Sequence, residues 1–374
     1  MSHRWAVAAL TACLMVGPAC SAPEGEEGSS RRPPSPSQSI DRVQQEADIR
    51  SMLRAIVRAE IAPGVVVLMR HGRDTRVIAA GQADIARGKP MTVEHRFRVG
   101  SITKSMVATV VLRLVQEGEL SLDDTVGQLL PGLLPDGELI TLKDLLSHTS
   151  GLPDYYDEVP AARPILRRAP VDHHALVVAA GRADSLFLPA SAQDYSNTNY
   201  AVLGLVVEQV TGRSLEANLD RRIFEPAHMT AASLRMTRVR EEPLAHGYLD
   251  GDDVTSRELS WAWAAGGVVS DAADVDRFFH ALFAGELVDT EVVDEMAEPV
   301  ADDLNVWSGY GLGLAEITNR CGKAVGHLGV VDGYASAAYT RRDADVAAVL
   351  LVTTNRNLHS GLLRDVLDTA LCGP

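Results

Sequence analysis

Apolar positions near the start of the chain change from helical to strand spacing. Residues 41–60 carry apolar side chains at near-helical intervals, which predicts a helix. Two β-branched runs, Val65–Met69 and Arg76–Ala80, follow it, with a polar turn between them. This arrangement is typical of a β-hairpin. The chain is therefore expected to begin with a helix and two strands.

The next apolar segments have helical spacing. Residues 101–117 fill both i, i+4 series, which predicts a helix buried on a wide face. The stretch of about 120–260 has the pattern of short helices and loops. Within it, a capping box at Thr141 predicts one helix start. Thr198–Val210 predicts a longer apolar helix that ends at Gly212.

The last third returns to strand patterns. Strands are expected at Gly309–Glu316, Tyr334–Thr340 and Val346–Thr353, and a final helix at Leu358–Leu371. Strands at both ends with helices between them favour an α/β (α+β) fold. Its antiparallel sheet is built from both termini and flanked by helices, with a mostly helical subdomain inserted at about 120–260. A cleft between sheet and insertion is the expected place for a site.

The N-terminal segment has the pattern of an export signal. Residues 1–20 have a basic start and then an apolar run that is too short to span a membrane but long enough for a signal peptide. Residues 21–39 are rich in Ser, Pro, Glu and Gly and are interpreted as a tether, so the folded domain is expected over 40–374. Lipidation of Cys20 and ordinary cleavage with release are both compatible with this segment, and either implies export.

Composition narrows the classes of partner. The chain has 374 residues, with 35 Lys plus Arg against 50 Asp plus Glu, and a net charge of −15. This balance argues against a nucleic-acid partner, which would need a basic surface. No metal-ligand spacing such as HExxH occurs, and no cofactor is expected. A small molecule or peptide is the expected substrate, with membrane contact only through a possible N-terminal lipid anchor.

The chain has four cysteines, of which Cys13 and Cys20 fall in the export segment. Cys321 and Cys372 remain. In an exported domain, two cysteines favour a disulfide over a metal site. Two free buried thiols are the alternative.

Ser101 and Lys104 form the first candidate for chemistry. Ser101 stands where the predicted helix begins, and side chains three positions apart share a helix face. Burial and the helix dipole both disfavour a charged lysine in this first turn, so a lowered pKa is expected. Such an amine helps to deprotonate a serine hydroxyl, which is otherwise a poor nucleophile. Only four lysines occur in the chain, and arginine could not fill this role.

Two further segments carry candidate groups. Tyr195 precedes a predicted helix and is a candidate general acid/base if positive charge lowers its pKa. Asn197 is placed to hydrogen-bond a substrate amide and Lys104. His327 lies in the C-terminal strand region. Taken alone, each is more readily a packed, capping or hydrogen-bonded structural residue.

Together these segments resemble the penicillin-recognising serine hydrolases. This superfamily includes class C β-lactamases, D-alanyl-D-alanine carboxypeptidases and related esterases, and the chain most resembles the exported Streptomyces-type carboxypeptidases. The similarity covers about 45–372 and is carried by FRVGSITKS (97–105), LPGLLPD (130–136), LLSHTSGLPDYY (145–156), YSNTNY (195–200), RIFEPAHM (222–229), GYGLGL (309–314) and HLGVVDGY (327–334).

The resemblance implies roles for these residues. Ser101 would attack an amide or ester carbonyl, and Lys104 and Tyr195 would manage its proton. Asn197 would orient the substrate amide, and the backbone N–H groups of Ser101 and Val330 would form the oxyanion hole. His327 would edge the cleft, Trp261 would wall the substrate pocket, and Cys321 and Cys372 would form a disulfide. Water would then hydrolyse the acyl-enzyme.

Three positions depart from the carboxypeptidase pattern. Leu328 stands where that family has a threonine that binds the substrate carboxylate, and Ala315 stands in place of an arginine. Asp332 replaces a neutral glutamine and would repel an anion. Discrimination for a free C-terminus should therefore be poor. The resemblance still makes a D-alanyl-D-alanine carboxypeptidase-like activity the first expectation, and an ester, a D-amino-acid amide and a β-lactam are the alternative substrates. A penicillin-binding protein that acylates without turnover is the other alternative.

Overall fold

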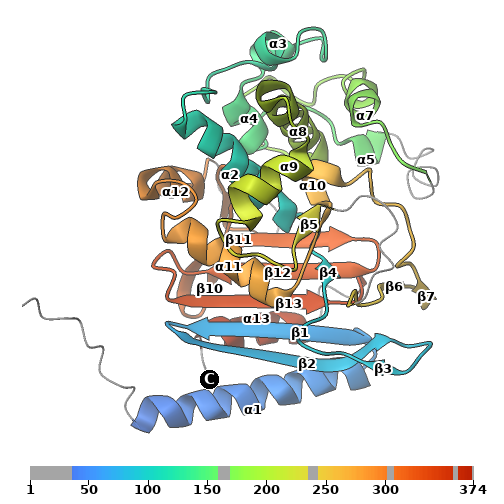
Figure 1. Cartoon of the computed structure of the whole chain (residues 1–374), viewed down its shortest axis with the longest axis vertical. Helices are drawn as coiled ribbons and strands as arrows, with labels where there is room; N and C mark the ends of the chain where they lie inside the picture. The colour runs from blue at the N-terminus through green and yellow to red at the C-terminus, as the bar shows by residue number, and fades with distance from the viewer. Residues whose placement is uncertain (1–35, 159–168, 235–242, 301–306, 357–360, 373–374) are drawn as a thin grey trace, which may run out of the picture.

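The computed structural model describes residues 36–158, 169–234, 243–300, 307–356 and 361–372. A sheet with flanking helices forms the lower part in Figure 1, and a mostly helical part lies above it. The predicted signal over 1–20 and the first part of the tether lie outside the described residues. Within the described ranges, no helix is long and apolar enough to cross a membrane.

An eight-stranded antiparallel sheet runs through the lower part in the order β3-β2-β1-β13-β12-β11-β10-β9. Strand β1 lies between β2 and the C-terminal strand β13 and pairs with both. Val67 of β1 is opposite Ile78 of β2 on one side and Leu350 of β13 on the other. The sheet is therefore built from both ends of the folded chain, as predicted. The strands are β1 (Gly64–His71), β2 (Asp74–Asp84), β3 (Lys89–Pro90), β9 (Gly309–Tyr310), β10 (Ala315–Asn319), β11 (Gly322–Val331), β12 (Tyr334–Thr340) and β13 (Val346–Val352).

Helices cover both faces of this sheet (Figure 1). The inner face, with Val66 and Leu68, packs against α2 (Ile102–Gln116) and α11 (Ala272–Phe283). The outer face, with Val65 and Val67, packs against α1 (Pro36–Arg58) and α13 (Gly361–Cys372). A strand buried on both faces has an unbroken apolar run rather than alternation, which explains the sequence of β1.

The helical part is the predicted insertion. Among the residues that the structure describes there, the longest helix is α8, whose N-cap is Ser196 and whose C-cap Gly212 adopts a left-handed conformation. The predicted capping box forms between Thr141 and Asp144. The helical elements between α2 and α11 are α3 (Val126–Leu129), η1 (Gly137–Leu139), α4 (Leu142–Leu146), α5 (Tyr155–Glu158), α7 (His173–Ala180), α8 (Asn197–Thr211), α9 (Leu215–Leu219), η3 (Asp220–Phe224) and α10 (Trp263–Gly266); α12 (Thr290–Ala297) follows α11.

Two small sheets were not predicted, because their strands are only two or three residues long. One has the order β4-β8-β5 and the other pairs β6 with β7. These strands are β4 (Phe97–Arg98), β5 (Ser233–Leu234), β6 (Tyr248–Leu249), β7 (Asp252–Asp253) and β8 (Val268–Ser270). The first sheet matters for the site, because β4 ends three residues before Ser101.

Two predicted boundaries are wrong. The expected strand Gly309–Glu316 is instead two short strands, β9 and β10, joined by a turn. The turn arises at its glycines: Gly313 has φ +83°, and a Cβ on Gly311 would lie 2.4 Å from the Met296 carbonyl oxygen. Helix α1 begins at Pro36, inside the predicted tether. The start of the last predicted helix, 358–360, lies outside the described residues.

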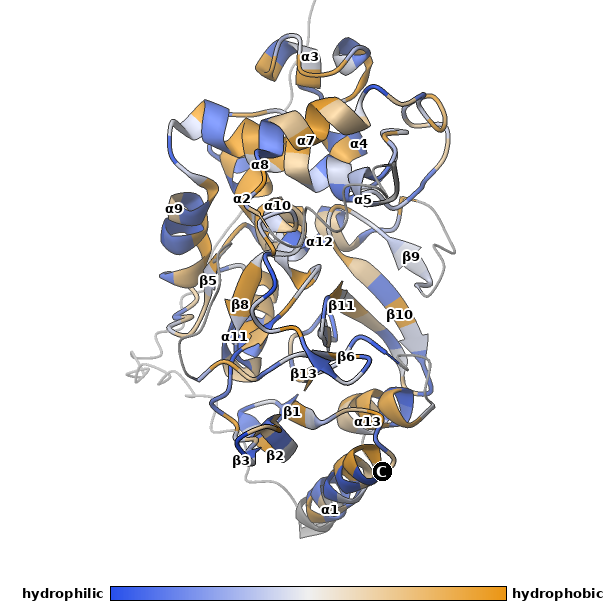
Figure 2. Cartoon of the chain, turned by 90° about the vertical axis from the view of Figure 1, so that its right-hand side faces the viewer, coloured by the Kyte–Doolittle hydropathy of each residue, from blue (hydrophilic) through white to orange (hydrophobic). Residues whose placement is uncertain are grey.

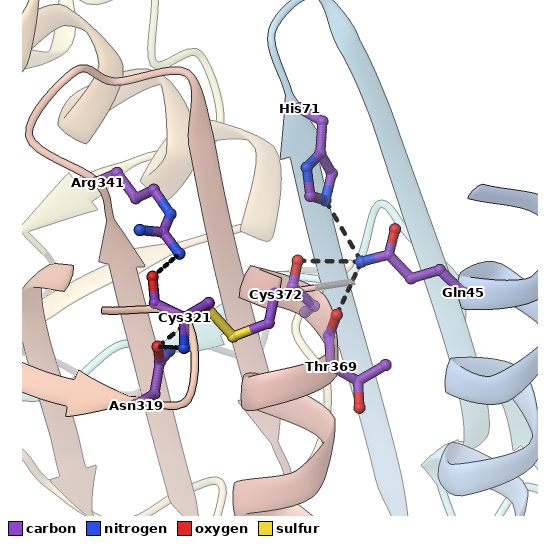
Figure 3. Close-up of a disulfide and its surroundings, with 8 residues drawn as sticks. Gln45, His71, Asn319, Cys321, Arg341, Thr369 and Cys372 are labelled. Atoms are coloured by element: carbon purple, nitrogen blue, oxygen red, sulfur yellow. Dashed lines mark hydrogen bonds between the residues drawn. A yellow bond between two sulfur atoms is a disulfide. The ribbon is translucent and has the colours of Figure 1, made fainter. Parts of the chain in front are cut away.

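A disulfide joins Cys321, in the turn between β10 and β11, to Cys372 at the end of α13 (Figure 3). Its partners are 51 residues apart in the sequence. Beside it, the Gln45 side chain of α1 donates a hydrogen bond of 2.7 Å to the Thr369 carbonyl oxygen. These contacts hold α13 against the outer face of the sheet.

Candidate active site

Ser101 lies at the N-terminus of α2, directly after a glycine in the left-handed conformation. Gly100 has φ +55°, which favours glycine, and a Cβ there would lie 2.6 Å from the Val330 nitrogen. Gly329 is equally constrained, since its Cβ would lie 2.0 Å from the Val99 carbonyl oxygen. The backbone that leads to Ser101 therefore packs directly against β11. This brings the Val330 peptide next to the backbone that leads into Ser101, and the oxyanion hole of these two N–H groups stays a prediction.

Lys104 lies one turn further along α2 and is completely buried. Its Nζ is 3.1 Å from Ser101 Oγ, 2.7 Å from Asn197 Oδ1 and 2.7 Å from the Ala265 carbonyl oxygen. The last two oxygens can only accept hydrogen bonds. In the neutral amine they take both N–H groups, so the lone pair is left facing the Ser101 hydroxyl. This arrangement suits removal of the serine proton.

Burial lowers the pKa of Lys104 to about 7, and the nearby Asp154 carboxylate partly opposes this shift. The lowered pKa agrees with the expectation from the sequence. An amine with this pKa is available as a base near neutral pH, where an ordinary lysine would be protonated.

Asn197 is oriented by a residue that the sequence did not single out. Asp154 Oδ2 accepts hydrogen bonds from the Asn197 side-chain amide at 2.7 Å and from its backbone N–H at 3.0 Å. Because the carboxylate holds the NH₂ group, the amide oxygen is the atom that faces Lys104. Asp154 thus fixes the orientation of Asn197 and influences the charge of Lys104.

Tyr195 hydrogen-bonds Ser101, but its pKa differs from the expected direction. Burial raises the pKa of Tyr195 well above its ordinary value, although the hydrogen bond to Ser101 opposes the rise. The expectation that positive charge lowers this pKa is wrong, because loss of solvent dominates and the neighbouring Tyr200 and Asp154 raise the pKa further. Tyr195 is therefore a neutral phenol near neutral pH. The imidazole of His148 packs on its ring with centroids 4.3 Å apart.

His327 does not line the cleft, although its neighbour Leu328 does. It is fully buried, and its Nε2 lies 3.0 Å from the Tyr310 hydroxyl while Nδ1 contacts the Leu328 carbonyl oxygen. Burial, aided by the charge of Lys104, lowers the pKa of His327 to about 3. The ring is thus neutral, with both nitrogens engaged. The ring anchors Tyr310 against β11, and direct contact of His327 with substrate stays a prediction.

A cleft of about 1150 Å³ opens over these groups. Ser101, Tyr195 and Asn197 line it, together with Val330, which is 47% exposed. Trp261 also lines the cleft, and its ring lies 4.9 Å from that of Tyr156; its contact with substrate stays a prediction. Among the described residues, no group of three or more His, Cys, Asp or Glu side chains could hold a metal ion.

The three departures from the carboxypeptidase pattern have different surroundings. Leu328 and Ala315 belong to one apolar cluster with Trp307, against which Tyr195 also packs. Asp332 lines the cleft, but it forms an ion pair of 2.8 Å with Arg257. Its charge is therefore partly compensated, so it repels anions less than the sequence implied.

The sequence reasoning also missed His148, Tyr310 and Trp307, which surround Tyr195 and His327. His148 and Asp154 both lie within the segment 145–156 that carries part of the resemblance. That segment was the available signal, but it did not reveal which of its polar residues point toward the site.

Comparisons with known proteins identify the family of the chain. The family model described as Beta-lactamase matches residues 49–371. The chain is 30% identical over 258 residues to a putative penicillin-binding protein, PbpX, from Bacillus subtilis, covering 67% of this chain and 61% of the relative. It is 37% identical over 190 residues to Esterase EstB from Burkholderia gladioli, covering 47% and 48%. The chain thus spans about half to three fifths of the length of these curated relatives.

Solved structures match over more of their length. The chain superimposes on a D-stereospecific amidohydrolase from Streptomyces sp. with a TM-score of 0.79 and 32% identity, covering 88% of this chain and 99% of that one. A D-amino acid amidase from Ochrobactrum anthropi gives a TM-score of 0.78 and 28% identity, covering 88% and 97%. The family match and the shared fold lead to one conclusion: the chain belongs to the beta-lactamase family, a superfamily of serine hydrolases.

Proposed function

We propose that this enzyme hydrolyses an amide or ester of a D-amino acid through an acyl-enzyme on Ser101. The observation that carries the proposal is the environment of Lys104, whose two acceptor-only partners leave its lone pair on Ser101 Oγ. Likeness to the D-stereospecific amidohydrolase and the D-amino acid amidase supports the choice of substrate class.

The mechanism follows from the contacts. Neutral Lys104 takes the proton of Ser101 as its oxygen attacks the carbonyl carbon. The N–H groups of Ser101 and Val330 stabilise the oxyanion, and loss of one such donor typically costs about 3 kcal/mol of barrier. Tyr195 protonates the departing amine or alcohol and recovers its proton from Lys104. Water then hydrolyses the acyl-enzyme by the reverse proton movements.

The leaving group is proposed to be neutral. Leu328 and Ala315 offer no hydrogen bond to a carboxylate and instead belong to an apolar cluster. A free C-terminal carboxylate beside Leu328 and Ala315 would lose its hydration without gaining a hydrogen-bond partner from either residue. An amide or ester avoids this cost. Hydrolysis of a D-Ala-D-Ala terminus is therefore the less favoured activity.

A substrate panel tests the proposal. Turnover of D-alanine amide, D-alanine p-nitroanilide, p-nitrophenyl acetate, nitrocefin and a D-Ala-D-Ala peptide would be compared for the native enzyme and Ser101→Ala. We expect turnover of the D-alanine amide or anilide that Ser101→Ala abolishes. Preferential turnover of the peptide would contradict the neutral leaving group. A stable penicillin adduct without turnover of any substrate would instead indicate a penicillin-binding sensor.

Export is a separate proposal and rests on residues 1–20 alone. Mass spectrometry of the N-terminus after expression in a bacterial host with a cell envelope tests it. Cleavage with labelling of Cys20 by palmitate would support a lipid anchor, and cleavage without labelling would support release. An intact N-terminus on cytoplasmic protein would overturn export.

A further inference from the structure

The cleft does not end at the catalytic residues. It continues beyond β11 to the outer face of the sheet, where residues of α13 also line it. This extension, here called the apolar recess, is lined by Ile317, Leu328, Ala337, Leu350, Leu363 and Leu367. In Figure 2, α13 lies between the lower end of β10 and α1, at the opposite end of the molecule from the helical insertion.

The floor of the recess is a row of side chains across three strands. Leu328 of β11 is directly opposite Ala337 of β12, which is directly opposite Leu350 of β13. Residues opposite each other in adjacent strands share a face. The row therefore continues from the cleft to α13, where Leu363 and Leu367 form the covering side.

The recess is joined to the catalytic residues through Tyr195. The Tyr195 ring lies 5.6 Å from that of Trp307, and Trp307 belongs to the same apolar cluster as Ile317 and Leu328. Asn197, in contrast, is tied to Asp154, and Tyr156 of the same segment packs on Trp261. The cleft therefore has two distinct sides, one at Tyr195 and one at Asn197.

The chemistry assigns these sides to the two halves of the substrate. During acylation Ser101 Oγ bonds to the carbonyl carbon, the bond from that carbon to the leaving oxygen or nitrogen breaks, and the leaving atom takes the Tyr195 proton. The leaving atom must then lie within hydrogen-bond distance of Tyr195. Whatever it carries extends toward Trp307 and Leu328, and the acyl half remains on the Asn197 side.

We propose that the apolar recess binds the leaving group, and that the enzyme prefers D-amino acid esters or amides whose alcohol or amine bears an alkyl or aryl chain. The proposal rests on the proposed acyl-enzyme mechanism. Each methylene buried in the recess should raise kcat/KM by roughly two- to fourfold, since the free energy gained by burying one CH₂ group corresponds to a ratio of about that size.

A series of n-alkyl esters tests this. The acyl group is D-alanine, and the alcohol grows from ethyl to hexyl, a range over which alcohol acidity hardly changes. A second series keeps ethanol and lengthens a straight-chain acyl group. We expect kcat/KM to rise with alcohol length and not with acyl length. The ratio kcat/KM is the proper measure, because it reports acylation even where deacylation limits kcat.

Two variants on one helix provide a matched pair. Leu367→Glu places a charge in the recess, whereas Leu362→Glu makes the same change on α13 at a side chain that does not line the cleft. Leu367→Glu should lower the hexyl-to-ethyl ratio of kcat/KM at least fivefold, and Leu362→Glu should retain it. If Leu367→Glu does not fold, competitive inhibition of the native enzyme by free alcohols from ethanol to hexanol tests the recess instead. We expect the affinity of the alcohol to rise with its chain length.

The outcomes separate the two proposals. Ser101-dependent turnover with no effect of alcohol length would overturn the recess and leave the hydrolase mechanism intact. A rise in kcat/KM with acyl length alone would overturn the assignment of the recess to the leaving group. If no ester or amide is turned over in a Ser101-dependent way, the proposed function itself fails, and the recess fails with it.

Discussion

Replacing Asp154 by asparagine removes a negative charge near Lys104 but leaves an oxygen to accept the hydrogen bonds of Asn197. The charge of Asp154 raises the pKa of Lys104 against the larger effect of burial. Without that charge, the pKa of Lys104 should fall below its value of about 7. The amine would then be neutral, and active as a base, at lower pH.

The size of this effect follows from the two hydrogen bonds in series, 2.7 Å each, that join Lys104 to Asn197 and Asn197 to Asp154. They place the carboxylate about 7 Å from Nζ, where an effective dielectric constant near 20 gives roughly 2 kcal/mol. Because Asp154 is only half-buried, solvent screening reduces this value. We therefore expect the acidic limb of the kcat/KM profile to move down by about 0.5 to 1.5 pH units.

The assay is the pH profile of kcat/KM for the native enzyme, Asp154→Asn and Asp154→Ala. Asp172→Asn is the control, since Asp172 caps α7, where asparagine caps equally well. Asp154→Ala should also lose at least tenfold in kcat/KM, because the amide of Asn197 is no longer held. An acidic limb of Asp154→Asn that stays in place, or moves to higher pH, would refute the electrostatic role of Asp154.

Three further predictions concern stability and packing. Between pH 7 and 9 the free energy of unfolding of the native chain should rise relative to that of Lys104→Met. The reason is that Lys104 in the unfolded chain keeps a proton that Lys104 in the folded chain releases. The rise is at most about 1.4 kcal/mol per pH unit. Denaturant titrations at several pH values measure this, and parallel stabilities would contradict it. Replacing Cys321 and Cys372 by alanine should lower the free energy of unfolding. The chain-entropy model gives a loss of roughly 4 kcal/mol for two cysteines 51 residues apart. A measured loss below about 1 kcal/mol would contradict this account. Gly329→Ala should reduce kcat/KM at least tenfold, because the added Cβ forces β11 away from Val99. Gly361→Ala is the control and should retain activity, because an added Cβ there meets no atom within 4 Å. Equal activities of the two variants would argue against the close approach of Gly329 to Val99.

The parts of the site that could be predicted depend on local spacing. Ser101 and Lys104 lie three residues apart on one helix, so their contact follows from helix geometry alone. Most of the sheet was likewise predictable, since strand patterns occur at both ends of the chain, but β11 was not among the predicted strands. Tyr195 and Asn197 needed the resemblance, because nothing in their own neighbourhood distinguishes them from packing or capping residues.

The rest depends on how distant segments meet. Asp154 reaches Asn197 across 43 residues, and Arg257 reaches Asp332 across 75, through loop paths that have no periodic signal. The direction of the Tyr195 pKa shift also depends on tertiary burial, which the sequence does not quantify. The apolar recess requires α13 to lie over β13, and this docking is set by the disulfide and the outer core together.

The position of β13 has a consequence for the order of synthesis. This strand lies between β1 and β12, although it is made almost 300 residues after β1. A ribosome that has reached residue 345 has already made Ser101, Lys104 and Tyr195, but β1 and β12 still have unpaired edges. Such edges invite pairing with other chains, and distant pairings form slowly. The growing chain must therefore be kept from aggregating until its last strand emerges, and activity should appear only after that strand is inserted.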